Sequence, residues 1–302
     1  MAEIPDPFTQ LSRPLLGELK RHCYRMMGGM QDAEDCLQET LLRGWRDFAS
    51  LRDSAAARAW LYQIATRVCL DALRHRKRRL TLFGPSLDEA EPGGRPWIEP
   101  YPTASDTDRQ DNLRLAFVSL LHNLSPRARA VLLLHDGVGM TAAETATALA
   151  MTPNAARSAL QRARAALPPT APTSATAPVE AYLTAWNSGN VGALIDLLHQ
   201  DIVMTMPPWQ RSFHSRDEVA NFMISVWPRY TGFRALPTEA NGQPAVAVYA
   251  ATSAEAFLPH SLHILSGTPT LTQIILYAPP LGARLIKEFG LPACLSGEAR
   301  PA

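Results

Sequence analysis

The sequence has little cysteine, and the four that it has are widely separated. Cys23, Cys36, Cys69 and Cys294 form no Cys-x-x-Cys pair in the 302-residue chain. Disulfide frameworks and zinc sites usually need close cysteine spacings. Three of the four fall on expected helical stripes, where a reduced cysteine is commonly a small core residue. We therefore expect no disulfide framework, no metal site and no cofactor.

A long hydrophobic run is also missing. No window approaches the roughly 18 apolar residues of a membrane-spanning helix, and the N-terminus lacks a basic segment followed by an apolar one. These absences predict a cytoplasmic protein with no membrane partner. Because 46% of the residues are hydrophobic and 19% are charged, the chain is expected to build two or three ordinary globular domains.

A strong net charge is missing too, but the total of +1 conceals a pattern. Residues 1–80 carry 14 Lys and Arg against 10 Asp and Glu, whereas residues 81–109 carry 2 against 6. Residues 110–168 then carry 6 against 3, and residues 169–302 carry 7 against 9. Two basic segments joined by an acidic one suggest a two-point grip on a polyanion, with acidic segments that could mask it.

The stretch Arg58–Arg79 has the pattern of an amphipathic helix with a basic end. Its apolar stripe consists of Leu61, Ile64, Ala65, Val68 and Ala72. Its other faces carry Gln63, Thr66, Arg67, Arg74 and Lys77. A basic end of this kind is most often only a solvated face, so a nucleic-acid role depends on what the other segments supply.

A second patterned helix is predicted from Asp32, as its N-cap, to Phe48. Its expected buried residues are Ala33, Cys36, Leu37, Thr40, Leu41, Trp45 and Phe48. Its outward residues are Asp35, Gln38, Glu39, Arg43 and Arg46. Because an earlier helix ends at Gly28, residues 1–80 are predicted to form a compact all-helical domain.

Residues 81–108 are predicted to be an acidic connector. Their proline density excludes a helix across Pro96–Pro102. Apolar side chains have little use in a plain flexible linker, so Trp97, Ile98 and Tyr101 are predicted to dock on a neighbouring domain. The alternative is a stiff extended spacer.

Residues 109–167 carry the start signals of a helix-turn-helix. Thr141 and Glu144 have the spacing of a capping box, and Thr152-Pro153 begins a further helix. Two short helices joined by a tight turn form such a motif. The last helix projects Asn154, Arg157, Ser158, Gln161, Arg162 and Arg164, whose paired donors suit base edges and phosphates. An ordinary three-helix bundle with a solvated last helix remains the alternative.

Residues 168–178 are predicted to be an exposed flexible linker, after which residues 179–295 form a separate domain. A helix with a break at Ser188–Asn190 comes first, and Phe213–Trp227 gives another. The period changes to that of strands at 202–206, 245–250, 260–265 and 271–277. Strands that follow one another without intervening helices predict an antiparallel α+β domain.

Together these segments resemble the extracytoplasmic-function (ECF) sigma factors of bacterial RNA polymerase. DAEDCLQETLLRGWRDF (Asp32–Phe48) and RAWLYQIATRVCLDALR (Arg58–Arg74) look like the central helices of that family's region 2, and Leu124–Leu167 looks like its region 4. WIEPYP, MPPW, ANGQPAVAVY and LPHSLHIL resemble the sigma-G-type subgroup, which carries a C-terminal SnoaL-like domain with a cone-shaped α+β fold. The expected fold is therefore two all-α domains followed by that domain.

The resemblance implies an alternative sigma factor whose partners are promoter DNA and the polymerase core, through its β′ clamp and β flap. The implied core-binding residues are Asp35, Gln38, Glu39 and Arg43. The implied minus-10 residues are Trp60, Gln63, Thr66, Arg67 and Arg74. The implied minus-35 residues are Asn154, Arg157, Ser158, Gln161 and Arg162. The C-terminal domain is taken to modulate the sigma part in cis.

Three positions depart from the family pattern. Arg67 and Arg157 stand where asparagine is frequent in relatives, so the promoter sequence cannot be transferred to this chain. Ala150 replaces the usual turn glycine, which costs strain if that residue needs a left-handed backbone.

A helix-turn-helix regulator fused to a small-molecule-binding or enzymatic domain is the alternative function, because the cone fold also hosts enzymes. The possible acid-base residues are Asp201, His214, His260 and His263. His260 and His263 are three apart on an expected strand, which places them on opposite faces. We therefore expect no catalytic residues, although a pocket for an unknown small ligand stays open.

Overall fold

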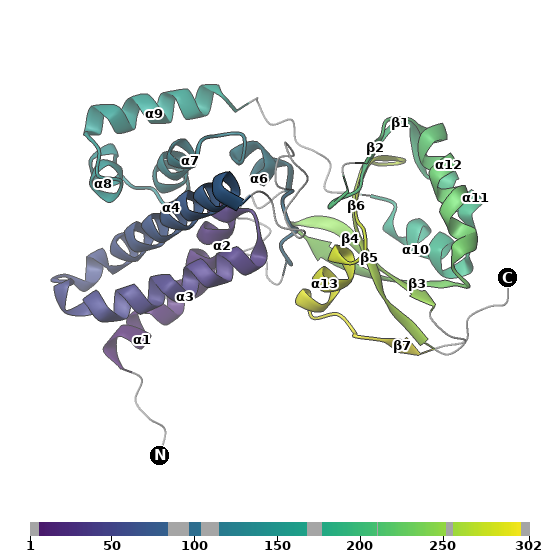
Figure 1. Cartoon of the computed structure of the whole chain (residues 1–302), viewed down its shortest axis with the longest axis horizontal. Helices are drawn as coiled ribbons and strands as arrows, with labels where there is room; N and C mark the ends of the chain where they lie inside the picture. The colour runs from purple at the N-terminus through teal and green to yellow at the C-terminus, as the bar shows by residue number, and fades with distance from the viewer. Residues whose placement is uncertain are drawn as a thin grey trace, which may run out of the picture. The chain divides into compact units, whose positions relative to one another are not determined.

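The computed structural model describes residues 6–83, 97–103, 115–167, 177–209, 211–251 and 256–296. The chain divides into two compact units. One consists of Met1–Glu99 and Leu115–Thr170, and the other of Pro100–Arg114 and Ala171–Ala302. The first unit is helical and the second combines helices with a sheet (Figure 1), so the predicted order of all-α and α+β parts is confirmed.

The N-terminal part of the first unit is a bundle of amphipathic helices. They are α1 (Pro7–Ser12), α2 (Leu16–Met27), α3 (Met30–Asp47) and α4 (Ala57–Phe83). Helices α2, α3 and α4 pack against one another (Figure 1). Each contributes one thiol to the shared core: Cys23, Cys36 and Cys69 are all buried and free. Hydrogen bonds from Cys23 and Cys36, together with burial, raise the pKa of the Cys69 thiol.

Two details of α3 differ from the sequence prediction. The helix begins at Met30 after Gly29, and Asp32 lies inside the first turn instead of capping it. Trp45, predicted to be buried, is 60% exposed. Thr40 marks the centre of the buried stripe, and Trp45 lies about 140° around the helix from it. The four-residue spacing between Leu41 and Trp45 therefore did not indicate burial of Trp45.

The C-terminal part of the first unit contains the predicted helix-turn-helix. Its helices are α6 (Leu115–Leu121), α7 (Pro126–Leu132), a π-helical turn (Leu133–Gly137), α8 (Ala142–Ala148) and α9 (Pro153–Ala165). The Thr141 and Glu144 capping box is present, and the Thr152 hydroxyl caps α9. Ala150 has φ of 50°, which is the left-handed conformation. This conformation is costly for alanine, which stands here in place of the usual turn glycine.

The second unit is built on a seven-stranded sheet. The strands are β1 (Leu198–Thr205), β2 (Ser212–Phe213), β3 (Phe233–Ala240), β4 (Gln243–Ala251), β5 (Ala256–Ser266), β6 (Leu271–Tyr277) and β7 (Leu295–Ser296). The main order is β2-β1-β6-β5-β4-β3, with β7 beside β5. The prediction of a purely antiparallel sheet is wrong, because β1 and β6 are parallel. The sequence also gave no signal for β3.

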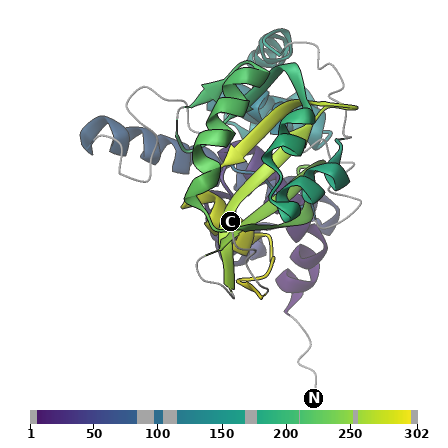
Figure 2. The same ribbon diagram turned by 90° about the vertical axis from the view of Figure 1, so that its right-hand side faces the viewer.

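Helices cover both faces of this sheet. Helices α10 (Val179–Ser188), α11 (Val191–Asp196) and α12 (Arg216–Val226) lie on one face, and α13 (Leu281–Glu288) lies on the other (Figures 1 and 2). The predicted break at Ser188–Asn190 separates α10 from α11. A Cβ atom at Gly282 would come within 2.7 Å of Ser261 Cα, so glycine permits the close approach of α13 to β5.

Candidate polymerase and promoter interface

The outward face of α9 consists of exposed polar side chains. They are Asn154, Arg157, Ser158, Gln161 and Arg162, at successive three- and four-residue spacings. Within the described part of the chain, the polar contact that these side chains make is internal to the helix: Arg157 Nη1 donates to Asn154 Oδ1 at 2.9 Å. This face is therefore open to an external partner.

The other side of α9 is fixed to its own domain. Ala156, Leu160 and Ala163 are buried. Arg164 Nε donates to Asp136 Oδ2 of the π-helical turn at 3.0 Å. The Arg164 side chain holds the pKa of Asp136 below its ordinary value. Arg164, which the sequence placed on the outward face, is thus a structural partner that orients the helix.

Helix α4 carries four of its five predicted DNA-contacting residues on one face. Trp60, Gln63, Arg67 and Arg74 recur at three-, four- and seven-residue spacings and are all partly or fully exposed. Thr66 is a correction, because it is completely buried and cannot touch an external strand in this structure. It lies about 100° around the helix from Arg67.

The burial of Thr66 has a structural reason. Its hydroxyl donates to Tyr62 O at 2.7 Å and lies 2.8 Å from Nε2 of the buried His22. Burial lowers the pKa of His22 to about 3, so the ring is neutral. Because the Thr66 hydroxyl donates its own proton to Tyr62 O, it accepts from His22 Nε2. Thr66 therefore joins α4 to α2 inside the bundle.

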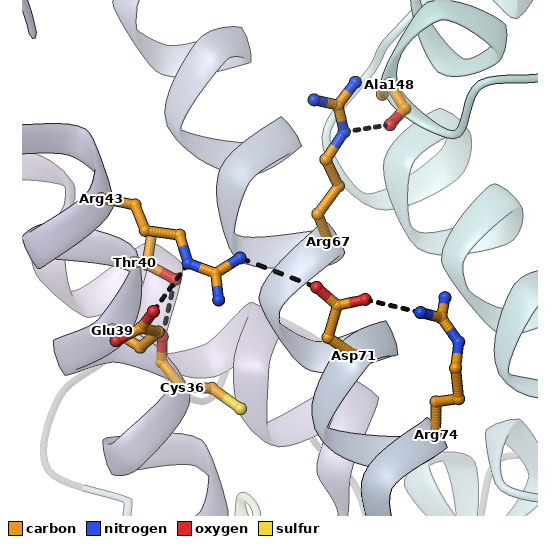
Figure 3. Close-up of polar contacts among 8 residues, drawn as sticks. All are labelled: Cys36, Glu39, Thr40, Arg43, Arg67, Asp71, Arg74 and Ala148. Atoms are coloured by element: carbon orange, nitrogen blue, oxygen red, sulfur yellow. Dashed lines mark hydrogen bonds and ion pairs between the residues drawn. The ribbon is translucent and has the colours of Figure 1, made fainter. Parts of the chain in front are cut away.

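Arg67 is already engaged by the helix-turn-helix (Figure 3). Its Nε donates to Ala148 O at 3.0 Å and its Nη2 approaches Thr147 O at 3.4 Å. These carbonyls belong to the last turn of α8, where a helix runs short of internal donors, although Thr147 O also accepts from Leu149 N. Arg67, Arg74, Arg127, Leu149 and Ala150 line one surface cleft between α4 and this turn.

A network of charged side chains joins α3 to α4 (Figure 3). Arg43 Nε donates to Glu39 Oε1 at 2.7 Å, and Arg43 Nη1 lies 3.7 Å from Asp71 Oδ2. Asp71 Oδ1 accepts from Arg74 Nη1 at 3.0 Å. The carboxylates raise the pKa of Arg43. Two predicted core-binding residues and one predicted minus-10 residue are thus paired within the bundle.

The outer face of α3 also presents apolar residues that the sequence analysis missed. Asp35 and Gln38 are exposed as predicted, and Leu42 and Trp45 lie beside them on the same side with exposures of 42% and 60%. Exposed aromatic and branched side chains beside polar ones are typical of protein interfaces. The sequence signal for this patch was the helical spacing of its residues: Leu42 follows Gln38 by four residues, and Trp45 follows Leu42 by three.

Residues on the two sides of Pro100 belong to different units. Ile98 is buried in the first unit, where Glu99 N donates to Gly28 O at 2.9 Å and Tyr24 Oη donates to Glu99 O at 2.6 Å. A Cβ atom at Gly28, which has φ of 80°, would come within 2.8 Å of Ile98 Cδ1. Trp97 is half-buried.

On the other side of Pro100, Tyr101 is buried in the second unit at the β3–β4 turn. Tyr101 N donates to Asn241 Oδ1 at 2.8 Å, and Asn241 N donates to Tyr101 O at 2.7 Å. Gly242 N donates to Thr103 Oγ1 at 2.8 Å. Asn241 has φ of 55°, a conformation typical of a β-hairpin turn. The turn therefore positions the Asn241 side-chain amide that accepts the hydrogen bond from Tyr101 N.

The four candidate acid-base residues of the second unit do not form one site. The Asp201 side chain is 92% exposed, and His214 is also on the surface. His260 and His263 were predicted to lie on opposite faces of the strand and therefore apart. That separation is wrong, because both rings contact Ser261 Oγ, at 3.1 and 2.8 Å. The β4–β5 register shifts at His260, and this bulge breaks the strand alternation.

These histidines belong to a continuous series of hydrogen bonds, which is buried at Tyr182, His263 and Ser261 and partly buried at His260 and Tyr230. His263 Nδ1 lies 2.9 Å from Tyr182 Oη, and His260 Nε2 lies 2.8 Å from Tyr230 Oη. Burial lowers the pKa of His263 to about 3 and that of His260 to about 4, so both are neutral at pH 7. Trp186 packs against Tyr182 and His263, and Phe233 packs against Tyr230 and His260.

Three family matches cover both units. Sigma-70 region 2 matches residues 11–79, Sigma-70 region 4 matches 114–167 and a SnoaL-like domain matches 179–267. The chain is 33% identical to the ECF RNA polymerase sigma factor SigG of Mycobacterium tuberculosis (strain H37Rv), over 95% of this chain and 85% of that protein. The chain belongs to the ECF sigma factors.

Other relatives agree with that assignment. SigJ of the same strain is 30% identical over 68% of this chain and 69% of its own length. The crystal structure of M. tuberculosis SigJ superposes with a TM-score of 0.63 at 24% identity, covering 93% of this chain and 98% of that one, which supports the shared fold. The predicted family is confirmed, and this alternative sigma factor directs transcription by RNA polymerase.

In this sigma factor, α2–α4 form region 2 and α6–α9 form region 4. Within the described ranges, no three His, Cys, Asp or Glu side chains are grouped to hold a metal. None of the described helices is long and apolar enough to cross a membrane.

Proposed function

We propose that this ECF sigma factor binds core polymerase through the outer face of α3. Asp35 and Gln38 supply polar contacts there, and Leu42 and Trp45 supply the apolar surface. Interface hot spots are enriched in tryptophan at positions that become desolvated in the complex. Glu39 and Arg43 lie at the edge of this surface, and the β′ clamp is its proposed partner.

Helix α9 is proposed to enter the major groove of the minus-35 element. The observation that carries this proposal is its continuous exposed face of amide, hydroxyl and guanidinium groups, oriented by the buried opposite side. Bidentate amides suit adenine and guanidinium groups suit guanine or phosphate. The α4 face bearing Trp60, Gln63 and Arg74 is proposed to hold the minus-10 strand once the duplex opens.

Reconstituted transcription tests this assignment. Promoters are first recovered by transcribing a fragment library with core polymerase and the full chain, and Gln161→Ala is then compared with the wild type. Loss of one good base contact is worth about 1–3 kcal/mol, so initiation should fall by about 10-fold. On templates whose minus-35 element is scrambled, the variant and the wild type should be equal. An equal deficit on both templates would exclude a base-specific role.

The SnoaL-like domain is proposed to modulate the sigma part in cis. The supporting observation is that the connector contacts both units on either side of Pro100, so Ile98–Glu99 and Tyr101–Thr103 are only one residue apart in the chain. A change at the Asn241 turn is therefore transmitted along a short covalent path.

Truncation tests that modulation. Chains that end near Ala166 and near Gly290 are compared with the full chain for run-off transcription at equal concentration. A change in output after either truncation supports regulation in cis, whereas unchanged output after both would refute it. If no version initiates at a promoter, the proposed promoter contacts fail instead.

We also infer that the second unit is not a catalyst. The Tyr182–His263–Ser261–His260–Tyr230 chain uses its polar atoms on one another, and its central residues are buried. A general base must reach its substrate within hydrogen-bond distance. A small ligand is proposed instead for the surface groove that includes Arg211 and Arg229, whose lining does not contain His263 or Ser261.

A further inference from the structure

The cleft between α4 and the turn after α8 carries an excess of positive charge, and it is called the basic cleft below. Three of its cations, Arg67, Arg74 and Lys77, belong to α4, and a fourth, Arg127, belongs to the first turn of α7. Among the described residues that line it, Asp71 is the one carboxylate. Four cations against one carboxylate leave a net charge of +3.

Asp71 does little to neutralise this charge, because it is shared with a cation outside the cleft (Figure 3). Its Oδ1 accepts from Arg74 Nη1 at 3.0 Å, and its Oδ2 lies 3.7 Å from Arg43 Nη1 of α3. A cleft lined by charges of one sign focuses the electric field and concentrates counter-ions. The basic cleft therefore attracts an anionic ligand.

The arginines of the cleft keep hydrogen-bond donors for such a ligand. Within the described residues, Arg67 donates through Nε and Nη2 to carbonyls of α8, and Arg74 donates through Nη1. Arg127 is exposed and makes no hydrogen bond or ion pair with another described residue. A guanidinium group has five N–H donors in a planar fork that matches phosphate oxygens, so each of these side chains can still bind phosphate.

The spacing of the cations selects a ligand with several phosphates. Arg67 and Arg74 are seven residues apart on one face of α4, or about 10 Å along the helix axis. Arg127 approaches the cleft from a different helix. A single phosphate group is too small to contact all three side chains, whereas a chain of phosphates can lie across them.

Apolar residues complete the lining of the cleft. Leu70 and Leu73 come from α4, and Pro126, Leu149 and Ala150 come from the helix-turn-helix part. The cleft has a volume of about 540 Å³, which lies within the range of roughly 300–1,000 Å³ typical of small-molecule sites. Cations beside apolar side chains suit a ligand that joins a phosphate chain to a ring system.

We propose that the basic cleft binds a polyphosphate, held by Arg67 and Arg74 on one side and by Arg127 on the other. A nucleoside triphosphate and an inorganic polyphosphate share this chemistry, and the apolar lining favours the nucleoside triphosphate. The binding itself does not depend on the promoter contacts. Its effect on transcription rests on the proposed function, because the ligand would occupy Arg74, which is assigned there to the minus-10 strand.

Equilibrium dialysis of the free full chain tests the site, with radiolabelled ATP as the probe and unlabelled tripolyphosphate and adenosine as competitors. ATP should bind, tripolyphosphate should displace it, and adenosine should displace it at least 10-fold less well. Tripolyphosphate weaker than unlabelled ATP would identify the nucleotide as the ligand, and equal potency would identify the inorganic chain. Absence of ATP binding at millimolar concentration, or displacement by adenosine as strong as by ATP, would overturn the proposal.

Three matched variants locate the bound probe. Arg74→Met and Arg127→Met remove one cation from each side of the cleft, and each should weaken ATP binding about 10-fold, because each loses charge-assisted hydrogen bonds. Arg78→Met removes an exposed arginine of α4 that does not line the cleft, so it should change the affinity less than 2-fold. An equal loss in Arg78→Met would show non-specific attraction, and an unchanged Arg127→Met would show binding to α4 alone. Either result would overturn the site.

Run-off transcription with added tripolyphosphate tests the effect on initiation. Arg127 lies outside the proposed promoter and polymerase contacts, so Arg127→Met should initiate as the wild type does when no tripolyphosphate is present. Tripolyphosphate should then inhibit the wild type at about 10-fold lower concentration than it inhibits Arg127→Met, and chelation of Mg²⁺ is the same in both reactions. Equal inhibition would overturn the competition with promoter DNA. Because dialysis needs neither DNA nor polymerase, failure of the proposed function is distinguished from failure of the ligand site.

Discussion

The two units use their buried polar side chains in different ways. In the helical unit, Arg129 and Thr66 donate to carbonyl oxygens of other residues. In the sheet unit, Tyr182, His263 and Ser261 bond mainly to one another. The difference follows from the backbone: helix ends leave unpaired carbonyls, whereas a sheet ladder pairs its backbone groups along the strands.

This comparison teaches where each unit is vulnerable. Removing a donor from the helical unit takes a hydrogen-bond partner away from one or more buried carbonyls, and the cost is the lost bonding of those groups. Removing one member of the side-chain series in the sheet unit disturbs the neighbours on each side of it. The first unit should therefore respond most strongly to the loss of single donors. Protonation should disturb both units, and in the second it acts through the linked His263 and His260.

The largest effect is expected for Arg129→Met. Its guanidinium donates to Leu121 O at 3.1 Å and to Leu124 O at 3.4 Å, besides its contact with Met26 O. Burial lowers the pKa of Arg129 to about 10, so the group stays charged at neutral pH. Methionine fills similar space without donors, and the free energy of unfolding should fall by about 3 kcal/mol.

Urea unfolding measures this loss. Arg127→Met, which changes an exposed arginine on the same helix, should shift the free energy by less than about 0.5 kcal/mol. If Arg129→Met cost no more than Arg127→Met, the buried guanidinium would have no special role in the helical unit.

Acid should next destabilise the sheet unit through its histidines. Burial lowers the folded-state pKa of His263 to about 3 and of His260 to about 4, below the unfolded value near 6.5. Their neutral forms stabilise the fold fully above about pH 6.5, and this stability is lost as the pH falls toward those folded values. Two protons taken up on unfolding give a slope of about 2.7 kcal/mol per pH unit.

The slope is measured from urea unfolding between pH 7 and pH 4.5. His260→Gln/His263→Gln keeps polar groups of similar reach but cannot titrate, so its stability should vary less with pH than that of the wild type. Equal slopes in the two proteins would place the acid sensitivity elsewhere, for example at His22 and His122, whose pKa values burial also lowers to about 3.

A smaller effect separates the two sides of α4. Thr66→Val removes the hydroxyl that contacts buried His22 and should cost about 1–2 kcal/mol in the free energy of unfolding. Gln63→Ala, on the partly exposed side, should leave that free energy nearly unchanged but lower minus-10-dependent initiation. A thermal unfolding scan and run-off transcription are measured for both variants. If Gln63→Ala were less stable than Thr66→Val, the assignment of a structural role to Thr66 and a DNA-contacting role to Gln63 would be contradicted.

The smallest effect concerns the turn before α9. Ala150 has φ of 50°, which glycine adopts without strain, so Ala150→Gly should stabilise the helix-turn-helix by about 0.5–1 kcal/mol. Ala143→Gly, at an exposed position within α8, should destabilise it by a similar amount. Differential scanning calorimetry distinguishes the two signs, and a destabilising Ala150→Gly would show that the turn is not strained.

Local start and stop signals predicted the helix-turn-helix well. The capping box of Thr141 and Glu144, the Thr152 cap and the break at Ser188–Asn190 all have side-chain or backbone causes within a few residues. The sequence also predicted the exposure of the α9 face, because its polar residues have a clear helical period.

Other features depend on packing that the sequence does not encode locally. Thr66 lies at the edge of the apolar stripe of α4, whereas Trp45 is an apolar residue on the outer face of α3, so residue type and spacing alone did not decide their burial. The His260 bulge depends on the register of β5 against β4. Arg67 donates to backbone carbonyls, and every residue type has one, so no partner residue marks that contact in the sequence.

The burial of three thiols between α2, α3 and α4 gives the protein a built-in chemical reporter. Cys294 is exposed, whereas Cys23, Cys36 and Cys69 are shielded in the folded bundle. A maleimide should therefore react at once with one sulfur per native chain and with the other three only as fast as region 2 opens. The kinetics of alkylation would follow the opening of the helical core without any engineered label.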